Sequence, residues 1–240
     1  MPAAKRRTRR GRPMCAAATD DAPARRRARA ARLRGLYAVT PDLADTADLV
    51  ARVEAAIKGG AAAIQYRSKT ADGALRRAQA GALARVHAAR GALFIVNDDA
   101  ALAAAVGADG VHLGEDDGSI DDARKELGPD RIVGVSCYND FARAEAAVAA
   151  GADYVAFGSF YASGVKPAAR RAELSLLQRA RRLRVPVVAI GGITAGNAPD
   201  LIRAGADAVA VITAVFGLAD VASVEFAARA LCEAVGQRGA

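Results

Sequence analysis

The stretch FIVNDDAALAAAVGADGVHLGEDD, residues 94–117, contains a strand, a helix and a second strand in succession. Two apolar runs, residues 93–96 and 110–113, are bounded by turn residues, so each predicts a buried strand. The Ala-rich segment 100–106 between them predicts a helix that ends at Gly107. Buried strands joined by a helix are typical of a parallel α/β sheet.

Polar side chains follow both of these predicted strands. Asn97 and Asp98 come directly after the first strand, and Asp117 lies in the acidic loop after the second. Ligands of parallel α/β proteins bind at the carboxyl ends of the strands, and carboxylate oxygens suit a divalent cation such as Mg²⁺. The same acids could serve only as caps of the helices that follow, and both interpretations stay open at this point.

The same alternation of strand and helix continues from residue 35 to the end of the chain. Strands are predicted at residues 36–40, 62–67, 93–96, 110–113, 131–136, 154–158, 185–190 and 208–213. Helices are predicted at residues 45–58, 73–89, 100–106, 120–127, 141–150, 172–183, 198–204 and 224–235. Eight such units predict an α/β fold, a single (β/α)8 TIM barrel over residues 35–240. An open doubly wound sheet is the alternative, but no GxGxxG motif follows the first strand.

Related phrases precede every second strand: GGAAAIQ, GADGVHL, GADYVAF and GADAVAV. In each of them a Gly ends a helix and a small residue leads into a strand. This spacing indicates a structural period of the fold and not a functional signature.

The positive charge of the chain is concentrated at its N-terminus. Residues 1–34 hold twelve Lys and Arg against two Asp, whereas residues 35–240 hold 22 Lys and Arg against 24 Asp and Glu. We therefore expect residues 1–34 to be a disordered basic extension. It could contact nucleic acid or act as a targeting peptide, although a solvated extension is the favoured interpretation. Deleting it should leave any activity of the barrel intact.

Composition excludes several classes of protein. The three Cys are far apart and form no CxxC motif, which argues against a zinc site or a disulfide framework and fits the cytoplasm. No apolar run approaches the roughly 18 residues of a membrane span. There are only two His, so a mechanism based on a His pair is not expected. The sequence does not indicate an oligomeric state.

The second predicted strand ends in a run of polar residues with a period of two. Gln65, Arg67 and Lys69 should point the same way, and together they would suit a pyrophosphate; a solvated strand end is the alternative. A Gly pair at residues 191–192, with the end of the eighth strand, matches the usual phosphate site of this fold. His112 lies inside a strand and is interpreted as structural, and Cys137 should point away from the site.

With these features in place, the chain resembles the thiamine-phosphate synthase family over residues 36–215. The resemblance is carried by YAVT, IQYRSK, FIVNDD, GADGVHLGEDD, IVGVSCYND, GADYVAFGSF, VVAIGGIT and GADAVAVIT, in this order. It implies a transferase of thiamine biosynthesis that joins a pyrimidine diphosphate to a thiazole phosphate. Pyrophosphate would leave first, and the thiazole nitrogen would then attack the pyrimidine carbocation.

The resemblance also implies the residues of the site. The pyrimidine diphosphate would be bound by Gln65, Tyr66, Arg67, Ser68, Lys69, Asn97, Ser136 and Lys166. The thiazole phosphate would be bound by Ser163, Gly164, Val165, Gly192, Ile212 and Thr213. One Mg²⁺ per subunit would be held by Asp98 and Asp117, and the catalytic residues would be Arg67, Lys69, Ser136 and Lys166.

Three departures from the family pattern stand out. Val165 replaces a hydroxyl donor in the loop after the sixth strand, Ser68 stands where Glu is usual, and Glu115 where Gln is usual. The main alternative is the thiazole tautomerase-like isomerase branch of the same barrel. That branch lacks the metal-binding acids, and therefore Asp98 and Asp117 favour the synthase. A phosphate-sugar isomerase or epimerase would need an acid–base pair across the site, and none is evident.

Overall fold

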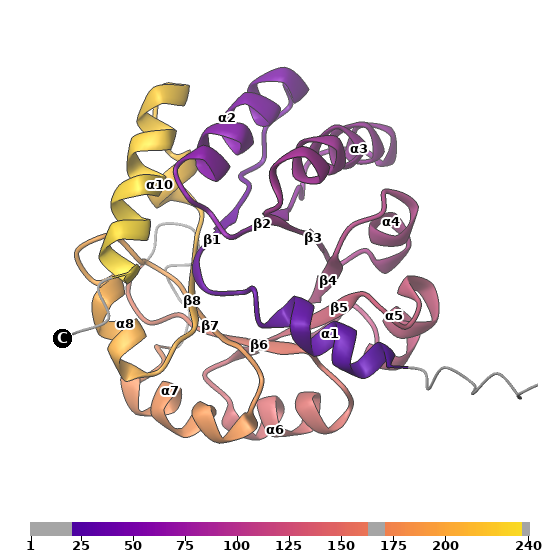
Figure 1. The fold of residues 1–240 in the computed structure, drawn as a ribbon, viewed down its shortest axis with the longest axis vertical. Coiled ribbons are helices and arrows are strands. Elements are labelled where there is room, and N and C mark those ends of the chain that lie inside the picture. The colour runs from indigo at the N-terminus through magenta and orange to yellow at the C-terminus, as the bar shows by residue number, and fades with distance from the viewer. Residues whose placement is uncertain (1–20, 163–170, 237–240) are drawn as a thin grey trace, which may run out of the picture.

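Eight parallel strands form a closed barrel in the order β1 to β8 in the computed structural model, which describes residues 21–162 and 171–236. The strands are β1 (Gly35–Val39), β2 (Ala63–Tyr66), β3 (Leu93–Asn97), β4 (Gly110–Leu113), β5 (Ile132–Tyr138), β6 (Tyr154–Phe157), β7 (Val187–Ile190) and β8 (Ala208–Val211). Figure 1 looks into the barrel and shows the helices as an outer ring around the strands. The predicted (β/α)8 barrel is confirmed.

Each strand is followed by a helix that covers the outside of the sheet. The helices after β1 to β8 are α2 (Thr46–Lys58), α3 (Gly73–Arg90), α4 (Ala100–Ala105), α5 (Ile120–Leu127), α6 (Phe141–Ala149), α7 (Leu174–Ala180) with the short 3₁₀ helix η1 (Arg181–Leu183), α8 (Ala198–Ala204), and α9 (Thr213–Phe216) with α10 (Val221–Gly236). Side chains of Asp45, Asp72, Asp99, Ser119 and Asp140 cap the N-termini of α2 to α6. No helix in the described ranges is long and apolar enough to cross a bilayer.

The Gly-Ala-Asp repeats have a structural role at the N-terminal ends of the strands. In each repeat one carboxylate oxygen accepts a hydrogen bond from the backbone N–H at the start of the preceding strand, or one residue into it. The contacts are Asp109 with Phe94 (2.9 Å), Asp153 with Val133 (2.8 Å) and Asp207 with Val187 (3.0 Å). The repeat therefore joins β3 to β4, β5 to β6 and β7 to β8 through side chains as well as through the sheet.

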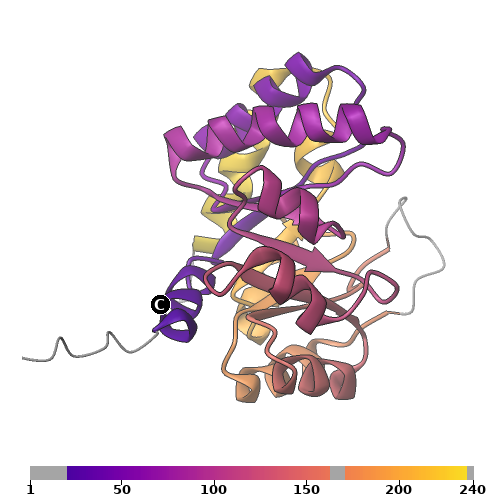
Figure 2. The same ribbon diagram turned by 90° about the vertical axis from the view of Figure 1, so that its right-hand side faces the viewer.

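A further helix, α1 (Ala22–Ala30), precedes the barrel, so the prediction that residues 1–34 are disordered throughout is wrong for this segment. Figure 2 shows α1 at one end of the barrel, on the left in that view. Ala30 and Leu33 are almost fully buried against the interior layer of the barrel that includes Tyr37. Burial of these apolar side chains stabilises the helix. The high Arg content of the segment makes this contribution hard to recognise in the sequence. Deleting residues 1–34 would therefore expose the floor of the barrel.

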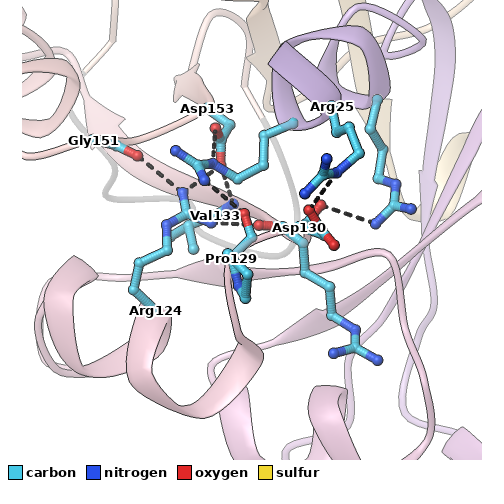
Figure 3. A network of polar contacts seen from close by, with 10 residues as sticks. Arg25, Arg124, Pro129, Asp130, Val133, Gly151 and Asp153 are labelled. Carbon is cyan, nitrogen blue, oxygen red and sulfur yellow. Dashed lines mark hydrogen bonds and ion pairs between the residues drawn. The ribbon is translucent and has the colours of Figure 1, made fainter. Parts of the chain in front are cut away.

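Arginines of α1 bind the loops that lead into the strands, as Figure 3 shows. Arg26 pairs with Asp153 at 3.2 Å and donates to the carbonyl of Pro129 at 2.6 Å. Arg25 pairs with Asp130 at 2.7 Å. Because these loops lie at the N-terminal ends of the strands, α1 closes the end of the barrel opposite to the predicted site. The remaining residues of the predicted extension, 1–20, lie outside the described part of the chain.

Candidate functional site

The loops after β2, β3 and β4 bring together three of the predicted site residues. The Lys69 ammonium lies 2.6 Å from a carboxylate oxygen of Asp98. Asp98 has a φ of +63°, a left-handed conformation that is uncommon for residues other than glycine, although Asp adopts it more readily than most. Residues in this conformation cluster at functional sites. This backbone turn directs the Asp98 carboxylate toward Lys69 and Asp117.

Asp117 lies beside Asp98 and is held by its own loop. One of its carboxylate oxygens accepts a hydrogen bond from the backbone N–H of Gly114 at 2.7 Å. Burial, together with the neighbouring carboxyl group of Asp98, raises the pKa of Asp117. A cation bound between the two carboxyl groups would relieve the repulsion that disfavours ionisation of Asp117. Within residues 21–162 and 171–236, no third His, Cys, Asp or Glu joins them to form a larger metal cluster.

Asp42, in the loop after β1, fixes the loop that carries the predicted cations, and sequence reasoning missed it. Its carboxylate accepts hydrogen bonds from the backbone N–H groups of Lys69 and Thr70, at 2.5 and 3.2 Å. Its other oxygen lies 3.6 Å from the Arg67 guanidinium. Burial would raise the pKa of Asp42, but the two N–H donors and Arg67 outweigh it and lower that pKa. The one signal in the sequence was an Asp two residues after the first predicted strand.

Two residues of the predicted diphosphate site turn their side chains elsewhere. The Tyr66 hydroxyl donates a hydrogen bond to Gln79 on α3 at 2.8 Å, on the outer side of the sheet. The Ser68 hydroxyl donates to Asp42 at 3.3 Å. Both side chains point away from the face that carries Gln65, Arg67 and Lys69, as the period of two along the strand predicts. Contact of Tyr66 and Ser68 with the diphosphate stays a prediction, and their backbone is the part available for it.

A chain of hydrogen bonds crosses the interior of the barrel below the site. It begins at Gln65 on β2, whose amide donates to the Tyr37 hydroxyl at 2.8 Å. Tyr37 contacts the Tyr154 hydroxyl at 3.0 Å, and Tyr154 contacts Nδ1 of His112 at 3.0 Å. Nε2 of His112 lies 2.9 Å from the hydroxyl of Ser136 at the end of β5. Gln65 and Ser136 were both predicted as site residues from the sequence. They are linked through Tyr37, Tyr154 and His112, which were not predicted as site residues.

The protonation state of His112 decides which group donates and which accepts in each of these hydrogen bonds. Burial lowers the pKa of His112 to about 4, so the ring is neutral near pH 7. Tyr37 accepts from Gln65, and among the described residues Tyr154 is the one acceptor available to the Tyr37 proton. The arrangement that satisfies these buried groups therefore has Tyr37 donating to Tyr154, and Tyr154 donating to Nδ1 of His112. The remaining proton lies on Nε2 and is donated to Ser136. The Ser136 hydroxyl proton is left to point into the mouth of the barrel, so His112 orients a predicted ligand residue.

The Gly pair after β7 is required by the loop that follows β6. A Cβ atom on Gly191 would lie 2.1 Å from the Ser159 hydroxyl, and one on Gly192 would lie 2.3 Å from the carbonyl of Ala162. Gly192 also has a φ of +64°. The Asn197 amide, which sequence reasoning did not select, donates to the carbonyl of Gly192 at 3.1 Å. The two loops therefore fit closely at this side of the barrel mouth.

The other predicted residues fall into three groups. Asn97 is the last residue of β3 and pairs in register with His112. Ile212 lies directly before α9, and Thr213 is the first residue of that helix. Cys137 is fully buried, and burial raises its pKa to about 12, so its thiol is not a nucleophile here. The predicted residues Ser163, Gly164, Val165 and Lys166 lie outside the described part of the chain.

Comparison with known proteins identifies the family. A family model described as thiamine monophosphate synthase matches residues 36–215. The chain belongs to this family. A thiamine-phosphate synthase from Aromatoleum aromaticum is 54% identical over 204 residues, which cover 85% of the chain and 98% of the relative. The enzyme of the same name from Thiobacillus denitrificans is 58% identical over 188 residues, 78% of the chain and 89% of the relative.

A solved structure of a protein of this family has the same fold as the chain. Thiamine phosphate pyrophosphorylase from Pyrococcus furiosus has a TM-score of 0.76 and 36% identity, and the match covers 87% of the chain and 98% of that protein. The chain is therefore a transferase of thiamine biosynthesis, a thiamine-phosphate synthase. The tautomerase-like alternative is not favoured.

Proposed function

We propose that the mouth of the barrel binds a pyrimidine diphosphate, a thiazole phosphate and one Mg²⁺ ion, and that it joins the two heterocycles to form thiamine phosphate. The observation that carries this proposal is the cluster of Lys69, Asp98 and Asp117. Two carboxylates fit Mg²⁺, which typically takes one or two of them and completes its coordination with water and phosphate oxygens. When bound, this ion would supply charge neutralisation to the departing pyrophosphate.

The residues of the chain would bind and orient the substrates. Arg67 and Lys69, held by Asp42, would grip the diphosphate, together with Lys166 as the family resemblance implies. Ser136 would donate its free hydroxyl proton to the same ligand, because His112 already occupies one of its acceptor positions. Gly192, Ile212 and Thr213, with Ser163, would hold the thiazole phosphate.

The proposed reaction proceeds in two bond changes. The C–O bond between the pyrimidine methylene group and the diphosphate breaks, and its electron pair leaves with pyrophosphate. The thiazole nitrogen then uses its lone pair to form a C–N bond with the carbocation. Because that nitrogen carries no proton, the reaction needs no general base. This agrees with a site in which His112 is neutral and engaged on both ring nitrogens.

The test is formation of thiamine phosphate and pyrophosphate from the two substrates, with Mg²⁺ and with EDTA. We expect product only with Mg²⁺, and a fall in kcat/KM of roughly 100-fold or more in Asp98→Asn, the range for loss of one charge-stabilising group. Glu233→Gln, which removes an exposed carboxylate on α10, is the matched control. Product formation in EDTA, or an Asp98→Asn enzyme within threefold of wild type, would contradict the proposal.

We also propose that the reaction takes place in the cytoplasm. The thiols of Cys137 and Cys232 are free, which agrees with a reducing compartment.

A further inference from the structure

A cleft lies at the opposite end of the barrel from the proposed reaction. Its walls are α1 on one side and the turns that lead into β6, β7 and β8 on the other. Its volume is about 940 Å³, which falls within the range of small-molecule sites. Figure 2 shows α1 at the end of the barrel where the strands begin. The cleft shares no residue with the cluster of Lys69, Asp98 and Asp117.

Positive charge dominates the lining of this cleft, to which six arginines contribute: Arg26, Arg27, Arg34, Arg181, Arg184 and Arg203. The two acids that line it are Asp153 and Asp207. Asp153 already binds Arg26, and Asp207 accepts the backbone N–H of Val187. Arg203 pairs with Asp200, which lies outside the lining. Within the described ranges the other four arginines, Arg27, Arg34, Arg181 and Arg184, have no carboxylate partner.

Several of these guanidinium groups have few or no partners of their own. Within the described ranges, the side chains of Arg27 and Arg184 form no hydrogen bond or ion pair. Arg34 donates only to the carbonyl of Ala31, at 3.2 Å, and Arg181 only to the carbonyl of Arg203, at 3.4 Å. Like charges that converge on one cleft repel each other, so a bound multivalent anion would lower the free energy of the folded protein.

The floor of the cleft is apolar. Its accessible part is formed by Val185, Pro186 and Ile202, which are partly exposed. Ala30 and Leu33 also line the cleft but are almost fully buried. A ligand that fits both parts carries several negative charges and a portion that can lie against apolar side chains. Guanidinium groups bind phosphate oxygens in a bidentate way, so phosphate is the anion that suits the arginines best.

We propose that this cleft is a second binding site, separate from the site of the transferase reaction, and that it takes a nucleotide carrying two or three phosphates. The phosphates would lie among Arg27, Arg34, Arg181 and Arg184, and the base would lie on the apolar floor. Binding would join α1 to the turns before β7 and β8, so the ligand would also stabilise the closed end of the barrel.

The experiment is calorimetric titration of the full chain with ATP, inorganic triphosphate and adenosine at low and at moderate salt. We expect ATP to bind, triphosphate to bind more weakly because it lacks a base, and adenosine not to bind. The affinity for ATP should fall as salt rises. Binding should persist in Lys69→Gln, which would separate this cleft from the anion site at the barrel mouth.

The decisive variant is the double substitution Arg27→Gln with Arg184→Gln. We expect it to weaken ATP binding roughly tenfold or more, because two charge-assisted contacts are lost. The matched control is Arg77→Gln with Arg85→Gln, which removes two exposed charges from α3, outside the cleft. Both pairs of substitutions leave residues 1–20 unchanged, and circular dichroism would establish that each variant is folded.

Three outcomes would overturn the proposal. The first is no ATP binding at low salt, and the second is an equal affinity in both double variants. The third is cleft-dependent binding of a 12-nucleotide single-stranded RNA without binding of ATP, which would make the surface a nucleic-acid site.

Discussion

Acidification should destabilise this protein through His112 in particular. The ring is buried between Tyr154 and Ser136, and burial lowers its pKa from 6.5 to about 4. In the unfolded chain the same residue takes up a proton with its ordinary pKa near 6.5. Between these two values the unfolded state binds more protons than the folded state, so stability falls as the pH falls.

The size of the effect follows from the two pKa values. Between pH 8 and pH 5, His112 alone should cost roughly 2 kcal/mol of unfolding free energy, and below pH 4 the loss should level off near roughly 3 kcal/mol. For a chain of this length, 2 kcal/mol corresponds to a fall in Tm of about 4–8 °C. The measurement is urea unfolding of the wild type at pH 8, 6.5, 5 and 4.

The comparison that isolates the residue is His112→Gln, in which the side chain stays polar but does not titrate. This variant should be less stable than wild type at pH 8, and the difference between the two should shrink by roughly 2 kcal/mol by pH 5. The pKa of His87 is also lowered by burial, but His87 is present in both proteins, so its contribution cancels in the difference between their stabilities. Parallel stability curves for the two proteins would refute the reasoning, because they would mean that His112 titrates in the folded barrel as it does in water.

Other substitutions test the packing and the loops. Leu33→Ala should cost about 2–5 kcal/mol in urea unfolding, because Leu33 is 1% exposed under the barrel. Gly134→Ala should greatly lower the yield of soluble protein, since a Cβ there would lie 1.9 Å from the ring of Tyr154; a normal Tm would contradict this. Asp42→Ala should raise the KM for the diphosphate substrate about tenfold in steady-state assays, because the loop that carries Arg67 and Lys69 loses its contacts with Asp42. Cys137 should resist iodoacetamide in the native protein and react in urea, as mass spectrometry would detect.

Most of the barrel could be predicted because its signals are local. Apolar runs separated by helical segments and by Gly define each unit without reference to the rest of the chain. The predicted segments 110–113, 120–127 and 198–204 coincide with β4, α5 and α8. The same local logic failed for α1, because its nine residues include four arginines, whose partners Asp130 and Asp153 come more than 100 residues later.

The site could be predicted only where residues at neighbouring strand ends combine. Asp98 and Asp117 follow adjacent strands, so parallel topology alone brings them together. The link between Tyr37 and Tyr154 could not be predicted in this way. It joins strands on opposite sides of the barrel across 117 residues of sequence, and neither Tyr differs from an ordinary core residue in its local pattern.

The docking of α1 also sets an order for how the molecule is completed. Synthesis proceeds at roughly 5–20 residues per second, so Asp153 leaves the ribosome roughly 6–25 s after Arg26, which it binds. Asp109 and Asp130, which pair with Arg29 and Arg25, leave the ribosome earlier in that interval. The helix therefore gains its carboxylate partners one after another, while the interior layer against which Leu33 packs is still incomplete. The helix that is made before all eight strands is therefore among the last elements to complete its contacts, at the N-terminal end of the barrel.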